Sequence, residues 1–257
     1  MSIHPTAVID PRAEIHAEVE IGPYVVVEGP VKIKRRTRVM AHATIMGWTE
    51  IGEENEIHPG VVLGGAPQDK AYLGEETYLR IGDHNIFREH VQAHRGTAPG
   101  SSTVIGNHNF LMASSHVGHN CNLGDHIVLA NGALLGGYVE VGNHAFISGH
   151  CVVHQFVRVG ELSLMRGLSG TSRDVPPYSI VDWQHTVRGV NAVGLKRAGF
   201  DEQRIRALKE AFRALFRKGR NLSLAIREIE ANKDLSPEVI ALLEFIKSSK
   251  RGVCFGA

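Results

Sequence analysis

An aliphatic residue recurs at every sixth position over most of the N-terminal two thirds of the chain. Helices repeat near 3.6 residues and strands at 2, so a period of six belongs to neither. The series starts at Ile3, is interrupted at Asp69 and near Pro99, and ends at Met165. Its other members are Ile9, Ile15, Ile21, Val27, Ile33, Val39, Ile45, Ile51, Ile57, Leu63, Ile81, Phe87, Ala93, Ile105, Leu111, Val117, Leu123, Leu129, Leu135, Val141, Ile147, Val153 and Val159. The pattern predicts a repeat architecture.

Small residues accompany each aliphatic. The next position is often glycine, and the fourth position is often alanine or serine. This hexapeptide repeat is typical of a left-handed parallel β-helix, in which about eighteen residues form a triangular coil and coils stack about 4.8 Å apart. We expect the aliphatic residues to fill the core, the alanine or serine to fit the tight interior, and glycine to serve corners that require a positive φ. The glycines are Gly22, Gly52, Gly82, Gly106, Gly118, Gly124, Gly136, Gly142 and Gly160.

The two interruptions are expected to be loops that leave the prism. They cover residues 65–78 (GAPQDKAYLGEETY) and 94–102 (HRGTAPGSS). Long loops on a rigid scaffold commonly carry function. Both precede a close histidine pair, His116 and His119, along the chain.

The repeat is expected to end at residues 174–179 (DVPPYS), since proline cannot continue a strand ladder. A helical region follows. Asp201 can cap a first helix that ends near Gly219, a second helix covers roughly 223–232, and Ser236 with Pro237 starts a third. The expected apolar positions are Ile205, Leu208, Phe212, Leu215, Leu242, Phe245 and Ile246. The sequence therefore predicts a β-helix domain over 1–190, with both loops and a connector, and a helical domain over 191–257.

Composition excludes several classes of protein. The 257 residues carry a formal net charge of +1, so neither a basic nucleic-acid binder nor an acidic tail is indicated. No segment resembles a signal peptide or reaches membrane-spanning length. The three cysteines, Cys121, Cys151 and Cys254, have no paired spacing, which favours a reducing compartment. We expect a cytoplasmic protein without an integral membrane segment.

One segment departs from this balance of charge. Between Lys196 and Arg220 there are nine Lys or Arg against three Asp or Glu. The segment is either a solvated face or a docking surface for an acidic protein, and both interpretations remain open.

The eighteen-residue coil places His119 beneath Gly137, and Gly137 beneath Gln155. An imidazole beside an unobstructed backbone N–H suits acyl transfer, because the imidazole removes a proton from an attacking hydroxyl and the amide stabilises the oxyanion. His94, His116 and His154 could line the same cleft. We favour catalysis for His119.

The chain has fifteen histidines, and most are expected to be structural. His108, His126 and His144 are one coil apart and predict a ladder of solvated corner residues. A metal site is an alternative, because the same prism carries γ-class carbonic anhydrases, in which three histidines bind zinc between subunits. Those enzymes pair two histidines five residues apart, whereas His116 and His119 are three apart.

Several longer motifs resemble one family along the whole chain. They are SSHVGHNC, LANGALLGG (129–137), VVHQF (152–156), RDVPPY (173–178), GLKRAGF (194–200) and SKRG (249–252). Together they are similar to the LpxA family of UDP-N-acetylglucosamine acyltransferases. The resemblance implies a homotrimeric left-handed β-helix that moves a 3-hydroxyacyl chain from acyl carrier protein to the sugar 3-hydroxyl. It also implies the first step of lipid A synthesis, with no metal or redox cofactor.

The resemblance also implies roles for individual residues. His119 matches the family's general base and Gly137 its oxyanion amide. Cleft-lining contacts are implied for His94, His116, His154 and Gln155, a sugar-binding role for Asp69, and a nucleotide or carrier contact for Arg197. The basic first helix then suits acyl carrier protein, which is acidic.

Some positions differ from the family's pattern near the substrate. Asn120 stands where an aspartate usually follows the base, and it cannot stabilise an imidazolium by charge. In the first loop Ala71 stands where the family has a lysine, and a lysine stands one position earlier, at Lys70. Tyr138 stands where the family has a histidine. Two further departures are Trp183-Gln184 in the connector and Ala198 after Arg197. Two alternatives therefore stay open: a divergent paralogue that acylates a 3-amino sugar, and a non-catalytic trimeric binding protein.

The acyl-chain pocket is expected near Met165 and Gly167. Gly167 matches a glycine that leaves the channel open in long-chain family members. Met165 and Arg166 just before it are bulky, although Arg166 could point to solvent. The length of the acyl chain is not predicted.

Overall fold

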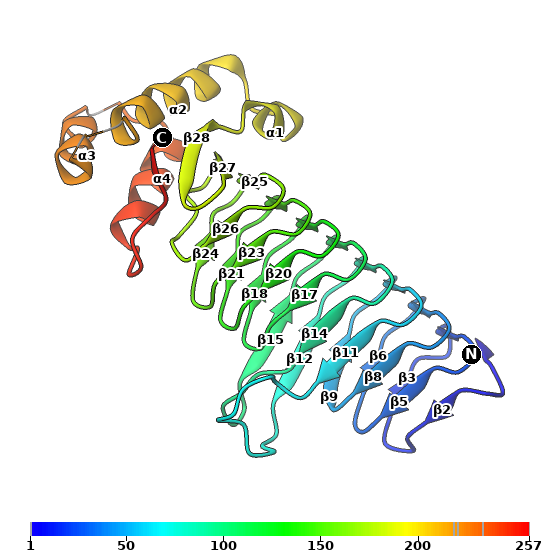
Figure 1. Cartoon of the computed structure of the whole chain (residues 1–257). Helices are drawn as coiled ribbons and strands as arrows, with labels where there is room; N and C mark the ends of the chain where they lie inside the picture. Colours follow the sequence, from blue (N-terminus) through cyan, green and yellow to red (C-terminus); the bar gives the residue numbers. More distant parts are fainter. Residues whose placement is uncertain (1, 218, 220, 233, 257) are drawn as a thin grey trace.

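The computed structural model describes residues 2–217, 219, 221–232 and 234–256, and it shows a triangular prism with helices at one end (Figure 1). The prism has three faces of short parallel strands, called here faces A, B and C. Face A contains β1 (Ser2–Ile3), β4 (Glu20–Ile21), β7 (Arg38–Val39), β10 (Glu56–Ile57), β13 (Ile86–Phe87), β16 (Phe110–Leu111), β19 (Val128–Leu129), β22 (Phe146–Ile147) and β25 (Leu164–Met165). Face B contains β2 (Val8–Ile9), β5 (Val26–Glu28), β8 (Thr44–Met46), β11 (Val62–Gly65), β14 (Gln92–His94), β17 (His116–Val117), β20 (Leu134–Leu135), β23 (Val152–Val153) and β26 (Gly170–Thr171). Face C contains β3 (Glu14–Ile15), β6 (Lys32–Ile33), β9 (Trp48–Ile51), β12 (Tyr78–Ile81), β15 (Ser102–Ile105), β18 (Asn122–Leu123), β21 (Glu140–Val141) and β24 (Arg158–Val159).

The aliphatic residue of each hexad points into the prism. Along face A the register pairs Ile57 with Phe87 across the first loop, and Phe87 with Leu111 across the second. All three side chains are fully buried. Each loop therefore leaves the prism and returns without disturbing the stacked core, which confirms the left-handed β-helix.

The glycines after the aliphatic residues do not have the expected positive φ. Positive φ instead occurs three residues after the aliphatic, at non-glycine residues such as Tyr24, Asn120 and Tyr138, with φ of 57°, 59° and 59°. A Cβ on Gly52 would lie 2.4 Å from the carbonyl oxygen of Gly82 in the next coil. The expectation was wrong. Glycine is needed at these positions because neighbouring coils approach closely there, and not because the backbone is left-handed.

The corner histidines form the expected ladder. His108, His126 and His144 are exposed, and their rings stack at centroid distances of 4.7 to 4.8 Å. His84 continues the stack at 4.7 Å from His108. The second loop lies between His84 and His108, so they are more than eighteen residues apart in sequence. The eighteen-residue spacing therefore did not predict that His84 belongs to the ladder.

Face A continues beyond the prolines. β27 (Ser179–Asp182) pairs parallel to β25, and β28 (Thr186–Val190) then returns antiparallel to β27. β29 (Phe255–Gly256) pairs parallel to β28. Pro176 and Pro177 occupy the turn before β27, so they interrupt the hexads without ending the ladder. The expectation of an end at 174–179 was wrong for this face.

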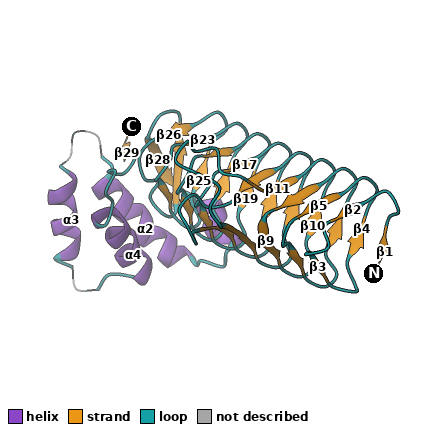
Figure 2. Ribbon diagram, turned by 90° about the horizontal axis from the view of Figure 1, so that it is seen from below, coloured by secondary structure: helices purple, strands orange, loops and turns teal. Residues whose placement is uncertain are grey.

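Four helices are described beyond the hairpin: α1 (Ala192–Arg197), α2 (Glu202–Leu215), α3 (Leu222–Glu230) and α4 (Pro237–Lys247). The side chain of Asp201 accepts a hydrogen bond from the Arg204 N–H at 2.8 Å and caps α2, as expected. The short α1 was not expected. Figure 2 shows α2, α3 and α4 together beyond the last coil, at the end opposite the N-terminus. The domain boundary after residue 190 stays a proposal, and β29 crosses it by returning to β28.

Candidate active site

A cleft of about 570 Å³ lies on the outer side of face B. The strands β14, β17, β20 and β23 pair in register there, which aligns the outward positions His116, Leu134 and Val152 in one column. The predicted residues that line the cleft are His94, His116, His119, Gly137, His154 and Gln155, joined by Gln68 from the first loop. The structure thus brings one loop and four neighbouring coils to a single cavity.

His119 and Gly137 are stacked as the coil length predicts. The Tyr138 N–H donates to the His119 carbonyl, and the Phe156 N–H donates to the Gly137 carbonyl, both at 2.9 Å. A Cβ on Gly137 would lie only 2.4 Å from His119 Nε2, so glycine leaves that edge of the ring free. Among the described residues the Gly137 N–H has no hydrogen-bond acceptor. The stacked pair thus offers an unobstructed Nε2 edge on His119 and, on Gly137, an N–H without an acceptor among the described residues.

The other edge of His119 is held from behind. Nδ1 lies 2.7 Å from Thr97 Oγ1 and 3.0 Å from Asn120 Oδ1. The Tyr138 ring stands edge-on to the imidazole, with centroids 5.4 Å apart and planes at 89°. On the open side, Asp69 Oδ2 lies 3.8 Å from Nε2. The His119 side chain is only 12% exposed, so these neighbours restrict its orientation.

Sequence reasoning missed Thr97. It is 7% exposed and comes from the second loop, where no periodicity operates. Its distance from His119 along the chain gave no signal of contact. The only available hint was that this loop precedes the histidine pair.

His94 and His116 are neutral cleft residues. The His94 Nδ1–H donates to the Ala66 carbonyl at 2.8 Å, and His94 Nε2 is buried without a partner among the described residues. The ring centroids of His94 and His116 are 5.1 Å apart. Burial lowers the pKa of both rings, and with the neighbouring histidines it lowers the pKa of His116 to about 4. Both therefore offer hydrogen bonds rather than charge near neutral pH.

The remaining predicted contacts lie around the cleft. His154 and Gln155 are exposed one coil above Gly137, and His154 Nδ1 lies 3.4 Å from an Arg251 nitrogen. Lys70 is exposed on the first loop. Arg197 ends α1 and lies outside the residues that line the cavity of this single chain.

The two residues expected to form the acyl pocket, Met165 and Gly167, lie in different environments. Met165 is fully buried inside the prism, paired with Ile147 and Val181 on face A. The strand directs its side chain inward, so the expectation that Met165 lines a pocket is corrected to a core role. Gly167 is exposed, and a Cβ there would meet only the Gly149 carbonyl oxygen, at 3.6 Å. Arg166 points outward and pairs with Asp182.

Neither a membrane span nor a metal cluster is found in the described part of the chain. No helix there has both the length and the apolar content needed to cross a membrane. Across the same residues, no three His, Cys, Asp or Glu side chains are grouped to hold a metal ion.

Comparison with known proteins places the chain in a family. Residues 30–65 and 102–137 match the bacterial transferase hexapeptide repeat, and residues 174–254 match domain 2 of UDP-N-acetylglucosamine O-acyltransferase. The prism and its cleft are thus those of a hexapeptide-repeat transferase.

Relatives that match along nearly their whole length identify the family within this class. The acyl-(acyl-carrier-protein)-UDP-N-acetylglucosamine O-acyltransferase of Syntrophobacter fumaroxidans is 46% identical over 98% of this chain and 99% of its own length. That of Halorhodospira halophila is 46% identical over 98% of each chain. The chain belongs to the family of acyl-(acyl-carrier-protein)-UDP-N-acetylglucosamine O-acyltransferases.

Solved structures agree with this assignment. The Francisella novicida UDP-N-acetylglucosamine acyltransferase superposes with a TM-score of 0.94 at 34% identity, covering 99% of this chain and 94% of that one. The Moraxella catarrhalis enzyme gives a TM-score of 0.93 at 39% identity, covering 99% and 100%. The similarity includes the helical end as well as the prism.

Proposed function

We propose that this chain transfers a 3-hydroxyacyl group from acyl carrier protein to the 3-hydroxyl of UDP-N-acetylglucosamine, the first step of lipid A synthesis. The observation that carries the proposal is the unobstructed Nε2 edge of His119 one coil below Gly137, whose N–H has no acceptor among the described residues, in a chain of this acyltransferase family. The reaction requires a base and an oxyanion donor, and no metal or redox group takes part in the proposed steps.

His119 acts as the general base. Its Nε2 takes the proton of the sugar hydroxyl while the hydroxyl oxygen bonds to the thioester carbon. The Gly137 N–H donates to the oxyanion that forms on the former carbonyl oxygen. The tetrahedral intermediate then collapses, the carbon–sulfur bond breaks, and the leaving carrier thiolate receives from the imidazolium the proton that came from the sugar hydroxyl.

The substrates are held by the residues around this pair. Asp69, whose carboxylate faces Nε2, binds the sugar at the reacting edge, and Lys70 and Arg197 contact charged groups of the nucleotide or the carrier. Gly167 leaves space for the acyl chain. The remaining proposed substrate contacts are His94, His116, Tyr138, His154 and Gln155. Asn120, expected among them, instead lies behind His119 with its side chain bound to the second loop.

The test compares His119→Ala with His126→Ala, a histidine of the exposed ladder. Purified protein is offered 3-hydroxyacyl carrier proteins of several lengths with UDP-N-acetylglucosamine or its 3-amino analogue, and products are followed by mass spectrometry. We expect loss of a general base to slow transfer about 10²- to 10⁴-fold, with His126→Ala active. Undiminished transfer by His119→Ala would show that His119 is not the general base. Product on the amine alone would favour the 3-amino sugar, and binding without transfer would favour a non-catalytic protein.

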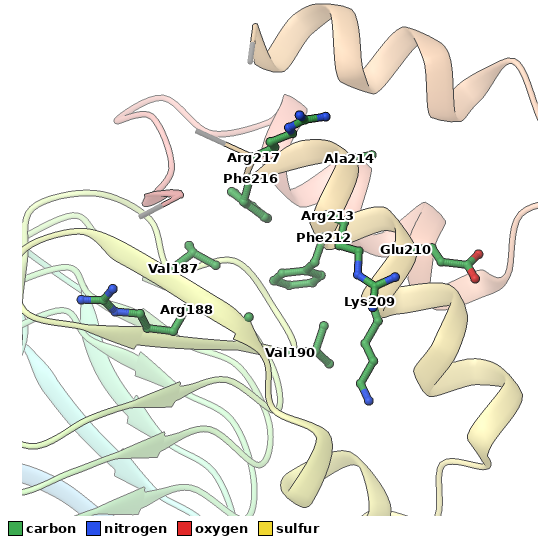
Figure 3. A pocket seen from close by; sticks show the side chains of 11 residues that line it. Val187, Arg188, Val190, Lys209, Glu210, Phe212, Arg213, Ala214, Phe216 and Arg217 are labelled. Atoms are coloured by element: carbon green, nitrogen blue, oxygen red, sulfur yellow. The ribbon is translucent and has the colours of Figure 1, made fainter. Parts of the chain in front are cut away.

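A basic groove is the proposed docking surface for acyl carrier protein. It is a cavity of about 780 Å³ between β28 and α2 (Figure 3). Its apolar floor includes Phe212, and its cations are Arg188, Lys209, Arg213 and Arg217. Lys218 and Arg220 of the basic segment lie outside the described residues. Such a surface suits an acidic carrier.

Reversing the charge of this groove tests the docking. We expect Lys209→Glu with Arg213→Glu to raise KM for acyl carrier protein several-fold with kcat little changed, and the salt dependence of kcat/KM to weaken. Arg227→Glu, an exposed change on α3, is the matched control. An unchanged KM in the double variant would remove this surface from the proposal.

The active assembly is proposed to be a homotrimer in the cytoplasm. Leu134, Val152 and Phe156 beside the cleft are 42%, 50% and 49% exposed in the single chain, which leaves apolar surface for a second copy to cover. The three cysteines are buried and unpaired, as suits a reducing compartment. Light scattering on the purified protein tests the trimer.

A further inference from the structure

Asn120 is fixed in one orientation by the second loop. Its side-chain Oδ1 accepts the Thr97 backbone N–H at 2.9 Å, and its Nδ2 donates to Ser101 Oγ at 3.0 Å. The Asn120 backbone N–H donates to Thr103 Oγ1 at 2.8 Å. A backbone N–H can only donate, so the atom that faces Thr97 N is the amide oxygen. The carboxamide therefore cannot flip without losing the hydrogen bond from the Thr97 backbone N–H.

This orientation assigns the tautomer of His119. Asn120 Oδ1 lies 3.0 Å from His119 Nδ1, and two lone pairs would repel at that distance. Nδ1 therefore carries the proton, and Nε2 has the free lone pair. That is the tautomer in which Nε2 can act as a base toward the open cleft.

Thr97 supplies the shorter contact to the same proton. Its Oγ1 lies 2.7 Å from Nδ1, against 3.0 Å for the amide oxygen. The nearby carboxylate of Asp69 lies 3.8 Å from Nε2, on the reacting edge instead. We propose that Thr97 is a positioning residue: its hydroxyl, with Asn120, holds His119 as the Nδ1-protonated base through uncharged acceptors only. The inference rests on the proposed role of His119.

The second loop is built to hold Thr97 in place. The Arg95 N–H donates to the Gly65 carbonyl at 3.0 Å, and the Gly96 N–H donates to the Tyr78 carbonyl at 3.2 Å. The loop is thereby tied to the base of the first loop and to face C. A Cβ on Gly96 would lie 2.4 Å from Ser101 Oγ, so the backbone turns as tightly as glycine permits. Thr97 is thus positioned by main-chain contacts that do not depend on its own side chain.

Removing the Thr97 hydroxyl should destabilise the imidazolium that forms on His119 during the reaction. A hydrogen bond to a group that becomes charged is worth about a tenfold to hundredfold change in rate. We expect Thr97→Val to lower kcat by that factor with KM for the nucleotide sugar nearly unchanged. Loss of an acceptor at Nδ1 disfavours the charged ring, so the acid limb of the kcat/KM profile should move to lower pH. A purely structural role would not move this limb.

Rescue variants complete the test. Thr97→Ser keeps a hydroxyl and should restore kcat and the acid limb, whereas Thr97→Val with Asn120→Asp should recover rate through a charged acceptor. If Thr97→Val lowers the thermal midpoint enough to unfold the protein, Thr97→Ala is measured in its place. Parental kcat and acid limb in both hydroxyl-free variants, or failure of Thr97→Ser to rescue, would overturn the inference. His119→Ala in the same series separates the two proposals, since its activity would instead reject His119 as the base.

Discussion

A single methyl group at Gly137 should displace the base without removing the oxyanion donor. The added Cβ would lie 2.4 Å from Nε2, 2.5 Å from Cε1 and 3.1 Å from Cδ2 of His119, whereas ordinary contacts begin at 3.4 Å. The backbone at Gly137 does not have a positive φ, so alanine fits its conformation. The ring must therefore move by about 1 Å, although Thr97 holds Nδ1 at 2.7 Å. A misplacement of about 1 Å costs roughly 10²-fold in rate, or about 2.7 kcal/mol of barrier.

The assay measures kcat and kcat/KM for both substrates by mass spectrometry, together with the thermal midpoint. We expect Gly137→Ala to lose about 10²-fold in kcat with a nearly unchanged midpoint, because the strain falls on one side chain and not on the coils. Gly149→Ala is the control, since its Cβ would meet only the Asn131 carbonyl oxygen, at 3.4 Å. Full activity of a folded Gly137→Ala would refute the inferred need for an unobstructed Nε2 edge.

Three further predictions concern stability and pH. Gly52→Ala should lower the free energy of unfolding by about 1–3 kcal/mol in denaturant titrations, because its Cβ would lie 2.4 Å from the Gly82 carbonyl oxygen. Burial holds the folded pKa of His116 near 4, below its ordinary 6.5, so the unfolded chain binds the proton first and stability falls as pH drops through that window. His116→Asn should therefore lose less stability than the parent between pH 7 and 5, measured by the same titrations. Asn120→Asp should move the acid limb of kcat/KM to higher pH, because a carboxylate favours the charged ring of His119; an unmoved limb would contradict this.

The periodic part of the fold could be predicted from sequence, because each hexad repeats one local solution. The same arithmetic placed His119 under Gly137. It failed where contacts do not repeat: Thr97 reaches the site through an irregular loop, and β27 resumes the ladder after the prolines. Met165 was assigned to the acyl pocket although it also ends the aliphatic series expected to fill the core, and the structure supports only the core role.

The left-handed corners also misled sequence reasoning about glycine. A positive φ is usually associated with glycine, yet here it falls on residues such as Tyr138 and Asn120. Asn120 tolerates this conformation because its side chain hydrogen-bonds locally to the second loop. Which hexad position carries the corner conformation depends on how coils stack, and composition alone does not reveal it.

The prism acts as a spacer of fixed increments between the cleft and the helical end. Each coil advances the axis by about 4.8 Å, so adding or removing one coil beyond Gly137 would shift the α2 groove along the axis without rotating it. Removing a single hexad would instead turn everything beyond it by a third of a revolution. Evolution or engineering can therefore change the separation between His119 and the proposed docking surface only in whole-coil steps.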